Sequence, residues 1–137
     1  MPLTQHQRVR LAEALTALFD VAVAVGRSAE RMALVESAVA VTSPQSADSM
    51  TLARCEALYR LGWDLGARGH SQQARACYNQ VLDLTASLLA SSATSVVVAT
   101  KARAAQAEAL VGLGDLARDR GDRPAAQVLF ERSLALR

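Results

Sequence analysis

The chain has 137 residues, a net charge of +2 at neutral pH, and a composition that is 51% hydrophobic but only 4% aromatic. This length suits a single domain whose core needs no disulfide or metal. Basic and acidic residues are interspersed, which argues against a nucleic-acid-binding face, and no run reaches the ~20 apolar residues that span a membrane.

Three segments of the chain align with one another without a gap: residues 13–26, 56–69 and 108–121. Each begins with Glu-Ala-Leu and ends on a glycine, and the similarity continues beyond that glycine. An internal repeat of this kind indicates one structural unit that occurs three times. We therefore expect a single domain over 1–137, with repeats at about 4–42, 44–90 and 96–137.

The first copy predicts a helix that ends near Gly26, since glycine readily takes the positive φ of a helix C-terminus. The apolar residues before it recur at the i, i+3, i+4, i+7 spacing of one helix face: Leu15, Leu18, Phe19 and Ala22. Ser28 stands where the N-cap of a second helix belongs. The apolar stretch from Leu11 to Val25 is interrupted by Glu13 and Asp20, so it makes a poor signal-peptide core, and we expect a cytoplasmic protein.

The second copy repeats the pattern, with Gly69 at the turn and Ser71 as the expected N-cap. Ser43-Pro44 is a candidate start for a lengthened helix that runs to Arg68. The apolar face of this helix is Leu58, Leu61, Gly62 and Leu65.

In the third copy, 91–95 is predicted to be a loop, and a helix is predicted to begin near Val96 although three valines weaken its start. Its apolar face is Leu110, Leu113, Gly114 and Ala117. Gly121 ends it, and Asp122 is the expected N-cap of the last helix. Each copy is therefore a helix, a short turn and an antiparallel helix.

The second and third copies resemble the tetratricopeptide repeat. The residues that carry the resemblance are Leu61-Gly62, Gly69, Ala74 and Tyr78, then Leu113-Gly114, Gly121, Ala126 and Phe130. The resemblance implies an all-α fold in which three antiparallel hairpins stack as a short α-solenoid. It also implies that the small residues let helices approach closely, and that Tyr78 and Phe130 are buried between hairpins.

The first copy departs from this pattern, because Phe19 replaces the helix glycine, Arg31 the alanine and Val35 the aromatic residue. Terminal repeats are often atypical. The spacing between the turn glycines also exceeds the usual thirty-four residues of the family, which implies longer helices or longer loops between repeats.

In tetratricopeptide arrays the first helix of each hairpin lines a concave groove. The resemblance therefore implies groove residues at Glu13, Thr16, Asp20, Glu56, Tyr59, Trp63, Glu108, Val111 and Asp115, with Arg118 as a positive edge. Five carboxylates favour a basic or apolar partner segment, with Trp63 and Tyr59 as anchors. They would repel the acidic tails that some members of the family bind. The alternatives are that the glutamates are merely solvated and that Trp63 packs against the adjacent hairpin.

No nucleophile elbow, phosphate loop, zinc pattern or catalytic carboxylate pair occurs in the sequence. His6 and His70 stand alone, and we interpret Cys55 and Cys77 as small hydrophobic residues, with a disulfide or reactive thiol as the alternative. We therefore expect no enzyme activity, no cofactor and no metal site.

The expected function is protein–protein interaction, as a small adaptor or chaperone; arginine-rich, alanine-rich composition suggests a bacterial source. The alternatives are a fragment of a larger bacterial regulator and a type III secretion chaperone, a class of similar size with three tetratricopeptide repeats. The last helix distributes Val128, Leu129, Leu134 and Leu136 over more than one face. This pattern predicts a two-fold homodimer through the C-terminal hairpin, or a longer array of which the chain is a part.

Overall fold

The computed structural model of the chain describes residues 2–42 and 48–137, and these form an all-α fold without a strand. Its six helices are α1 (Gln5–Ala24), α2 (Ser28–Val41), α3 (Asp48–Ala67), α4 (Ser71–Ala90), α5 (Val96–Asp119) and α6 (Arg123–Ala135). The expected loop before α5 is confirmed at 91–95. The predicted helix start at Ser43-Pro44 lies outside the described residues.

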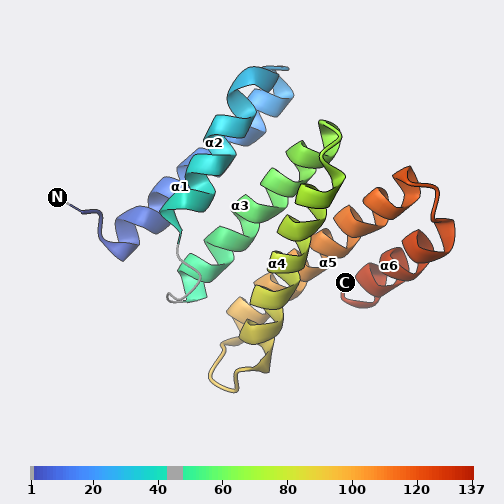
Figure 1. Ribbon diagram of the computed structural model, residues 1–137. Coiled ribbons are helices and arrows are strands. Elements are labelled where there is room, and N and C mark those ends of the chain that lie inside the picture. Colours follow the sequence, from blue (N-terminus) through green and yellow to red (C-terminus); the bar gives the residue numbers. More distant parts are fainter. Residues whose placement is uncertain (1, 43–47) are drawn as a thin grey trace.

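Consecutive helices pack in pairs, so that α1 lies against α2, α3 against α4 and α5 against α6. Figure 1 shows these three hairpins in a row, with α1 and α6 in the hairpins at its two ends. Within the described ranges α1 contacts α3 and α3 contacts α5, whereas α2 and α4 have no close backbone contact, nor do α4 and α6. The first helices of the hairpins therefore form one continuous layer, and the second helices are spread apart.

The turn at the centre of each hairpin has the same geometry. Gly26, Gly69 and Gly121 have φ of 76°, 86° and 85°. The N–H group after each glycine donates to a carbonyl near the end of the preceding helix: Arg27 to Ala22 at 2.8 Å, His70 to Leu65 at 2.8 Å and Asp122 to Ala117 at 2.9 Å. This is the Schellman pattern that ends a helix on glycine, and the predicted turns are confirmed.

Two of the three predicted N-caps are wrong by one residue. α2 and α4 begin at Ser28 and Ser71 themselves, and their N-caps, Arg27 and His70, make no side-chain capping bond. The third prediction is confirmed, because Asp122 Oδ1 accepts a hydrogen bond from the Ala125 N–H at 3.1 Å. The serines were misplaced because the tight Schellman turn needs only one residue after the glycine before the next helix starts.

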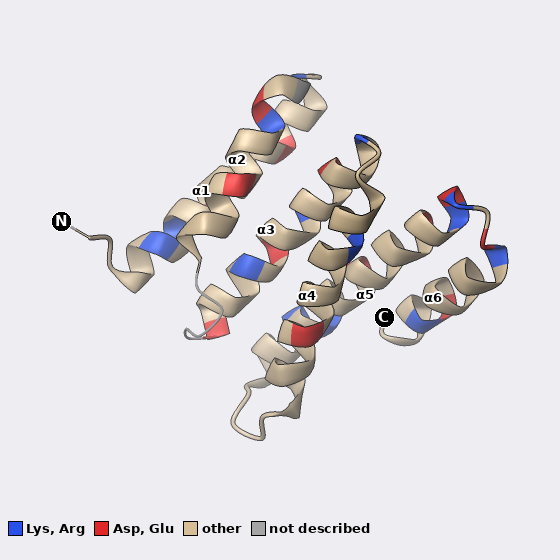
Figure 2. Ribbon diagram, in the orientation of Figure 1, with Lys and Arg blue, Asp and Glu red and all other residues tan. Residues whose placement is uncertain are grey.

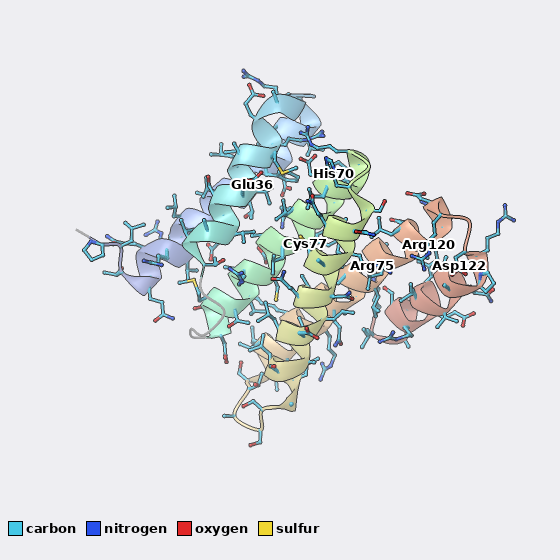
Figure 3. All side chains as sticks on the ribbon, in the orientation of Figure 1. Glu36, His70, Arg75, Cys77, Arg120 and Asp122 are labelled. Carbon is cyan, nitrogen blue, oxygen red and sulfur yellow. The ribbon has the colours of Figure 1, made fainter. Side chains whose placement is uncertain are left out.

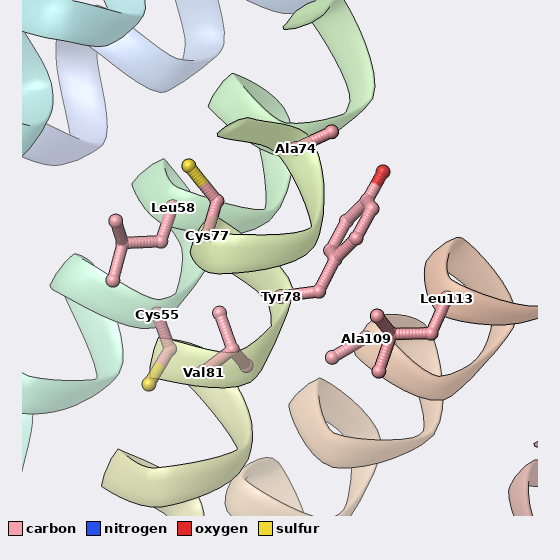
Figure 4. Packing of buried hydrophobic residues seen from close by; sticks show 8 residues of the cluster. All are labelled: Cys55, Leu58, Ala74, Cys77, Tyr78, Val81, Ala109 and Leu113. Atoms are coloured by element: carbon pink, nitrogen blue, oxygen red, sulfur yellow. The ribbon is translucent and has the colours of Figure 1, made fainter. Parts of the chain in front are cut away.

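The central core lies where the second hairpin meets the third (Figure 4). Its buried residues are Cys55, Leu58, Ala74, Cys77, Tyr78, Val81, Ala109 and Leu113. The Tyr78 ring is 3% exposed and lies between two helix glycines: a Cβ at Gly62 would stand 2.9 Å from the ring, and one at Gly112 would overlap it. Tyr78 is therefore the predicted wedge between hairpins.

Phe130 was expected in the same role and is only half-buried. Its ring lies over Gly114 of its own hairpin, where a Cβ would overlap it. No described helix packs on the other side of the Phe130 ring, so the prediction that it is buried between hairpins is wrong.

Polar contacts join the first hairpin to the second. Arg31 of α2 pairs with Asp64 of α3 at 2.9 Å, and the Asp64 side chain is 0% exposed. Arg54 donates to the carbonyl oxygens of Val39 and Thr42, both at 3.1 Å, and so covers the C-terminal end of α2. Arg31 occupies the repeat position of Ala74, so the departure of the first copy from the pattern has a partner in the second copy.

Candidate functional site

The layer formed by α1, α3 and α5 presents one surface, called here the first-helix face. The predicted groove residues that are exposed are Glu13, Asp20, Glu56, Trp63, Glu108 and Arg118, and those that are half-buried are Tyr59, Val111 and Asp115. Thr16 is the exception, because it is buried in the core face of α1 and its Oγ1 donates to the Glu13 carbonyl at 2.9 Å. The prediction that Thr16 lines a groove is wrong, since a threonine that satisfies its hydroxyl within the helix packs like an apolar residue.

A hollow of about 310 Å³ lies between α1 and α3. Its walls are mostly apolar and aromatic, and Asp20 and Arg60 form the polar part of the lining. The full lining is Phe19, Asp20, Val23, Tyr59, Arg60 and Trp63. Concave sites of this kind, mainly apolar with a few polar groups, are typical of ligand contacts.

A second hollow of about 200 Å³ lies between α3 and α5, and Trp63 lines it as well as the first. Its floor includes Tyr78 and Gly112, and Asp115 and Arg118 lie at its polar side. Trp63 therefore stands between two adjoining hollows on one face.

Trp63 is 40% exposed although it also packs against the first hairpin. The rings of Trp63 and Phe19 pack edge to face, with their centroids 6.2 Å apart. The Arg31 guanidinium lies 5.5 Å from the Trp63 ring centroid, a cation–π distance. One portion of the Trp63 ring is therefore packed against the neighbouring hairpin, as the alternative interpretation expected, and the rest is open to solvent.

The charges of the first-helix face are mixed rather than uniformly acidic. Arg60 of α3 donates to both carboxylate oxygens of Asp20 of α1, at 2.9 and 3.0 Å, and so links the second hairpin to the first. Arg118 pairs with Asp115 at 3.1 Å. Arg60 was not among the predicted site residues, although it adjoins Tyr59 in sequence. The other carboxylates of this face, Glu13, Glu56 and Glu108, form no ion pair with a residue in 2–42 or 48–137.

Glu108 and Tyr59 titrate above their ordinary ranges. Desolvation against the neighbouring helix raises the pKa of Glu108, and Glu56 adds to the rise while Arg60 and Arg137 oppose it. Burial also raises the pKa of Tyr59, with further contributions from Glu108 and Asp115. These shared influences place Glu56, Arg60, Glu108 and Tyr59 in one electrostatic neighbourhood.

Asp64, like Arg60, was not among the predicted site residues. It is fully buried, and besides Arg31 it accepts from Arg68 Nε at 3.1 Å. It adjoins Trp63 in sequence, and Arg31 contacts both residues. The ion pair thus helps to hold the Trp63 ring in place.

Within 2–42 and 48–137 there is no group of three or more His, Cys, Asp or Glu that could hold a metal ion. Cys55 and Cys77 are buried free thiols, and burial raises the pKa of Cys55 to about 12, with Glu56 adding to the rise, so this thiol is protonated at neutral pH. None of the helices within residues 2–42 and 48–137 combines the length and the apolar character needed to cross a membrane.

Figure 2 shows positive and negative residues scattered along the helices rather than gathered by sign. A notch of about 270 Å³ between α4 and α5 contains Arg75 and Arg120, which Figure 3 labels, together with Asp119. Its charges are mixed like those of the first-helix face, but it contains no aromatic side chain.

No protein-family model, curated protein or solved structure matches the chain. The interpretation of the site therefore rests on its own geometry.

Proposed function

We propose that the chain is a protein–protein interaction module, a short α-solenoid of the tetratricopeptide type that acts as a small bacterial, cytoplasmic adaptor or chaperone. It holds a segment of a partner protein along the first-helix face. The arrangement of the layers supports this proposal. The first helices touch one another while the second helices are spread apart, and a stack built in this way curves toward its closer layer. The first-helix face is then the concave side.

The observation that carries the proposal is Trp63, an exposed aromatic ring fixed between two hollows. Tryptophan is enriched among residues that dominate binding energy, because it buries a large area at little cost in side-chain entropy. The contacts with Phe19 and Arg31 hold the ring in place before a partner arrives, which lowers the entropy cost of binding.

The chemistry of the face favours a segment with an apolar side chain for the hollow beside Phe19 and Val23. A basic residue nearby would meet Glu56 and Glu108. Because Asp20 and Asp115 already have arginine partners, the attraction for a basic segment is weaker than five free carboxylates would give. Binding should therefore depend on the apolar contact first and on salt second.

A peptide library displayed on phage tests this proposal. Selected peptides are labelled with a dye and titrated with the protein while fluorescence polarisation is measured. Trp63→Ala should weaken binding about tenfold or more, and Glu56→Lys should weaken it less, with the loss largest at low salt. Val96→Ala, at an exposed position outside both hollows, is the matched control. Selected peptides that bind Trp63→Ala and the natural protein equally would show that the first-helix face is not the site.

A further inference from the structure

The outer face of α1 is apolar although it is exposed. Leu11, Ala14, Leu18, Val21 and Val25 recur at alternating spacings of three and four residues, which places them on one side of the helix. Leu18 is 52% exposed and Val21 is 57% exposed. The core residues of α1, including Ala12 and Phe19, lie on a neighbouring side of the helix, so Leu18, which the apolar spacing grouped with Phe19, faces outward. A helix that is apolar over most of its circumference normally has neighbours on more than one side.

The repeat alignment shows what this face corresponds to. Ala14, Leu18 and Val21 stand at the repeat positions of Ala109, Leu113 and Leu116 in α5. In α5 those positions pack against the second hairpin, so that Ala109 is 0% exposed and Leu113 is 8% exposed. The outer face of α1 is thus the face by which a hairpin of this chain stacks on the one before it.

The last helix presents the other half of the same contact. Phe130 and Leu134 stand at the repeat positions of Tyr78 and Leu82 in α4. Tyr78 is covered by α5, and Leu82 packs against the core. In α6, Phe130 is half-buried and Leu134 is 71% exposed, and both line a mostly apolar hollow of about 420 Å³. The two end hairpins of the row in Figure 1 therefore carry the repeat equivalents of both sides of the junction between hairpins two and three, except that Ala17 stands at the position of Gly112.

We propose that copies of the chain associate head to tail, with the outer face of α1 from one copy seated on the Phe130–Leu134 face of the next. The contact resembles the packing of α5 on α4 within the chain, with the Phe130 ring displaced from the position of the Tyr78 ring because Ala17 carries a Cβ where Gly112 has none. Each of the two faces exposes a large apolar side chain, Leu18 at 52% and Leu134 at 71%, which a neighbouring hairpin would cover. The association is heterologous, because two different surfaces meet, so it extends beyond a dimer unless a ring closes. It differs in this respect from the two-fold dimer through the C-terminal hairpin that the sequence suggested, and it leaves the first-helix face free.

Two single substitutions test the proposal, one on each face. Leu18→Arg blocks the outer face of α1, and Leu134→Arg blocks the face of α6. Both side chains are more than half exposed, so both variants should keep the helical circular dichroism spectrum. Val96→Arg, at an exposed valine on neither face, is the matched control. The mass of each protein is measured by light scattering coupled to size exclusion across the micromolar range.

The natural chain and Val96→Arg should gain mass with concentration, and each of the two face variants alone should be a monomer. An equimolar mixture of the face variants should form a dimer and stop there, because each contributes the face that the other lacks. A natural chain that stays monomeric overturns the proposal. So does a Leu18→Arg variant that still dimerises, which indicates the two-fold contact through α6, or a mixture that remains monomeric.

Discussion

Charged side chains pair across the junction between the first and second hairpins, beside the Phe19–Trp63 ring contact, whereas one aromatic ring fills the junction between the second and third hairpins. At the first junction Arg31 reaches the buried Asp64, and Arg60 pairs with Asp20. At the second, Tyr78 fills the space that Gly62 and Gly112 leave open. The same repeat unit therefore stacks in two chemically different ways.

The difference teaches what fixes the angle between neighbouring hairpins. A ring against glycines is held by close packing, where a change of one methyl group is felt. A buried ion pair has directional demands, and removing one partner strands the other charge. We expect the second junction to respond mainly to volume and the first mainly to charge.

The largest effect should follow removal of the wedge. Tyr78→Ala leaves a cavity between α3, α4 and α5 and should lower the free energy of unfolding by about 3–5 kcal/mol. Phe130→Ala is the comparison within the same repeat pattern, and it should cost clearly less because Phe130 is only half-buried. Chemical denaturation measures both. Equal losses would mean that covering the Tyr78 ring with the third hairpin adds nothing to stability.

The second-largest loss of stability should follow removal of the Arg31–Asp64 ion pair at the first junction. Arg31→Met should lower the free energy of unfolding by about 3 kcal/mol. This is the lower end of the range for breaking a buried ion pair, because Asp64 keeps Arg68 as a partner. The double variant Arg31→Met with Asp64→Leu removes both charges and should recover most of that loss. Denaturation of the two single variants and the double variant gives the coupling energy. Additive losses would contradict an electrostatic junction.

A single methyl group should distinguish tight from loose packing at the second junction. A Cβ at Gly112 would overlap the Tyr78 ring, so Gly112→Ala should destabilise the fold by about 1–3 kcal/mol. Gly66→Ala is the matched control, because its Cβ would meet Leu116 Cδ2 at an ordinary 3.5 Å, and it should stabilise the fold by about 0.5 kcal/mol. Thermal melts of the two variants should shift in opposite directions.

The smallest effect concerns the carboxylate that α5 brings to the second junction. The pKa of Glu108 is raised in the fold, so its contribution to stability is fully present below the ordinary value of 4.5 and is lost as the pH rises through the folded pKa. Glu108→Gln should therefore raise the melting temperature slightly at neutral pH and not at a pH well below that value. Glu36→Gln, at an exposed site on α2, controls for the loss of one surface glutamate.

The sequence predicted the helices and turns because both depend on local signals. Apolar spacing placed the helices, although Leu18, which it assigned to the core face of α1, is 52% exposed. Glycine at a repeated offset placed the turns at Gly26, Gly69 and Gly121. Phe130 was misjudged because the pattern shows what a residue resembles but not whether a neighbour covers it. Thr16 was misjudged because a threonine can satisfy its hydroxyl within its own helix.

The site was predicted less completely than the fold. Trp63 stood out because it departs from the apolar face of its helix. The pairs Asp20–Arg60 and Arg31–Asp64 were missed, since their members lie 40 and 33 residues apart and meet only once the angle between hairpins is set. Arg31 departs from the repeat pattern, and this mismatch is the signal in the sequence that Arg31 has a charged partner.

The turn glycines carry a consequence for the handedness of the backbone. Nothing lies within 4 Å of an added Cβ at Gly26, Gly69 or Gly121, so space does not exclude a side chain there. What excludes it is chirality, because an L-residue pays about 1–2 kcal/mol to adopt the left-handed region. A D-alanine introduced by chemical synthesis has the mirror-image preference and would fit each turn without strain. It would also restrict the unfolded chain, so these three positions are where a mirror-image residue would strengthen the protein.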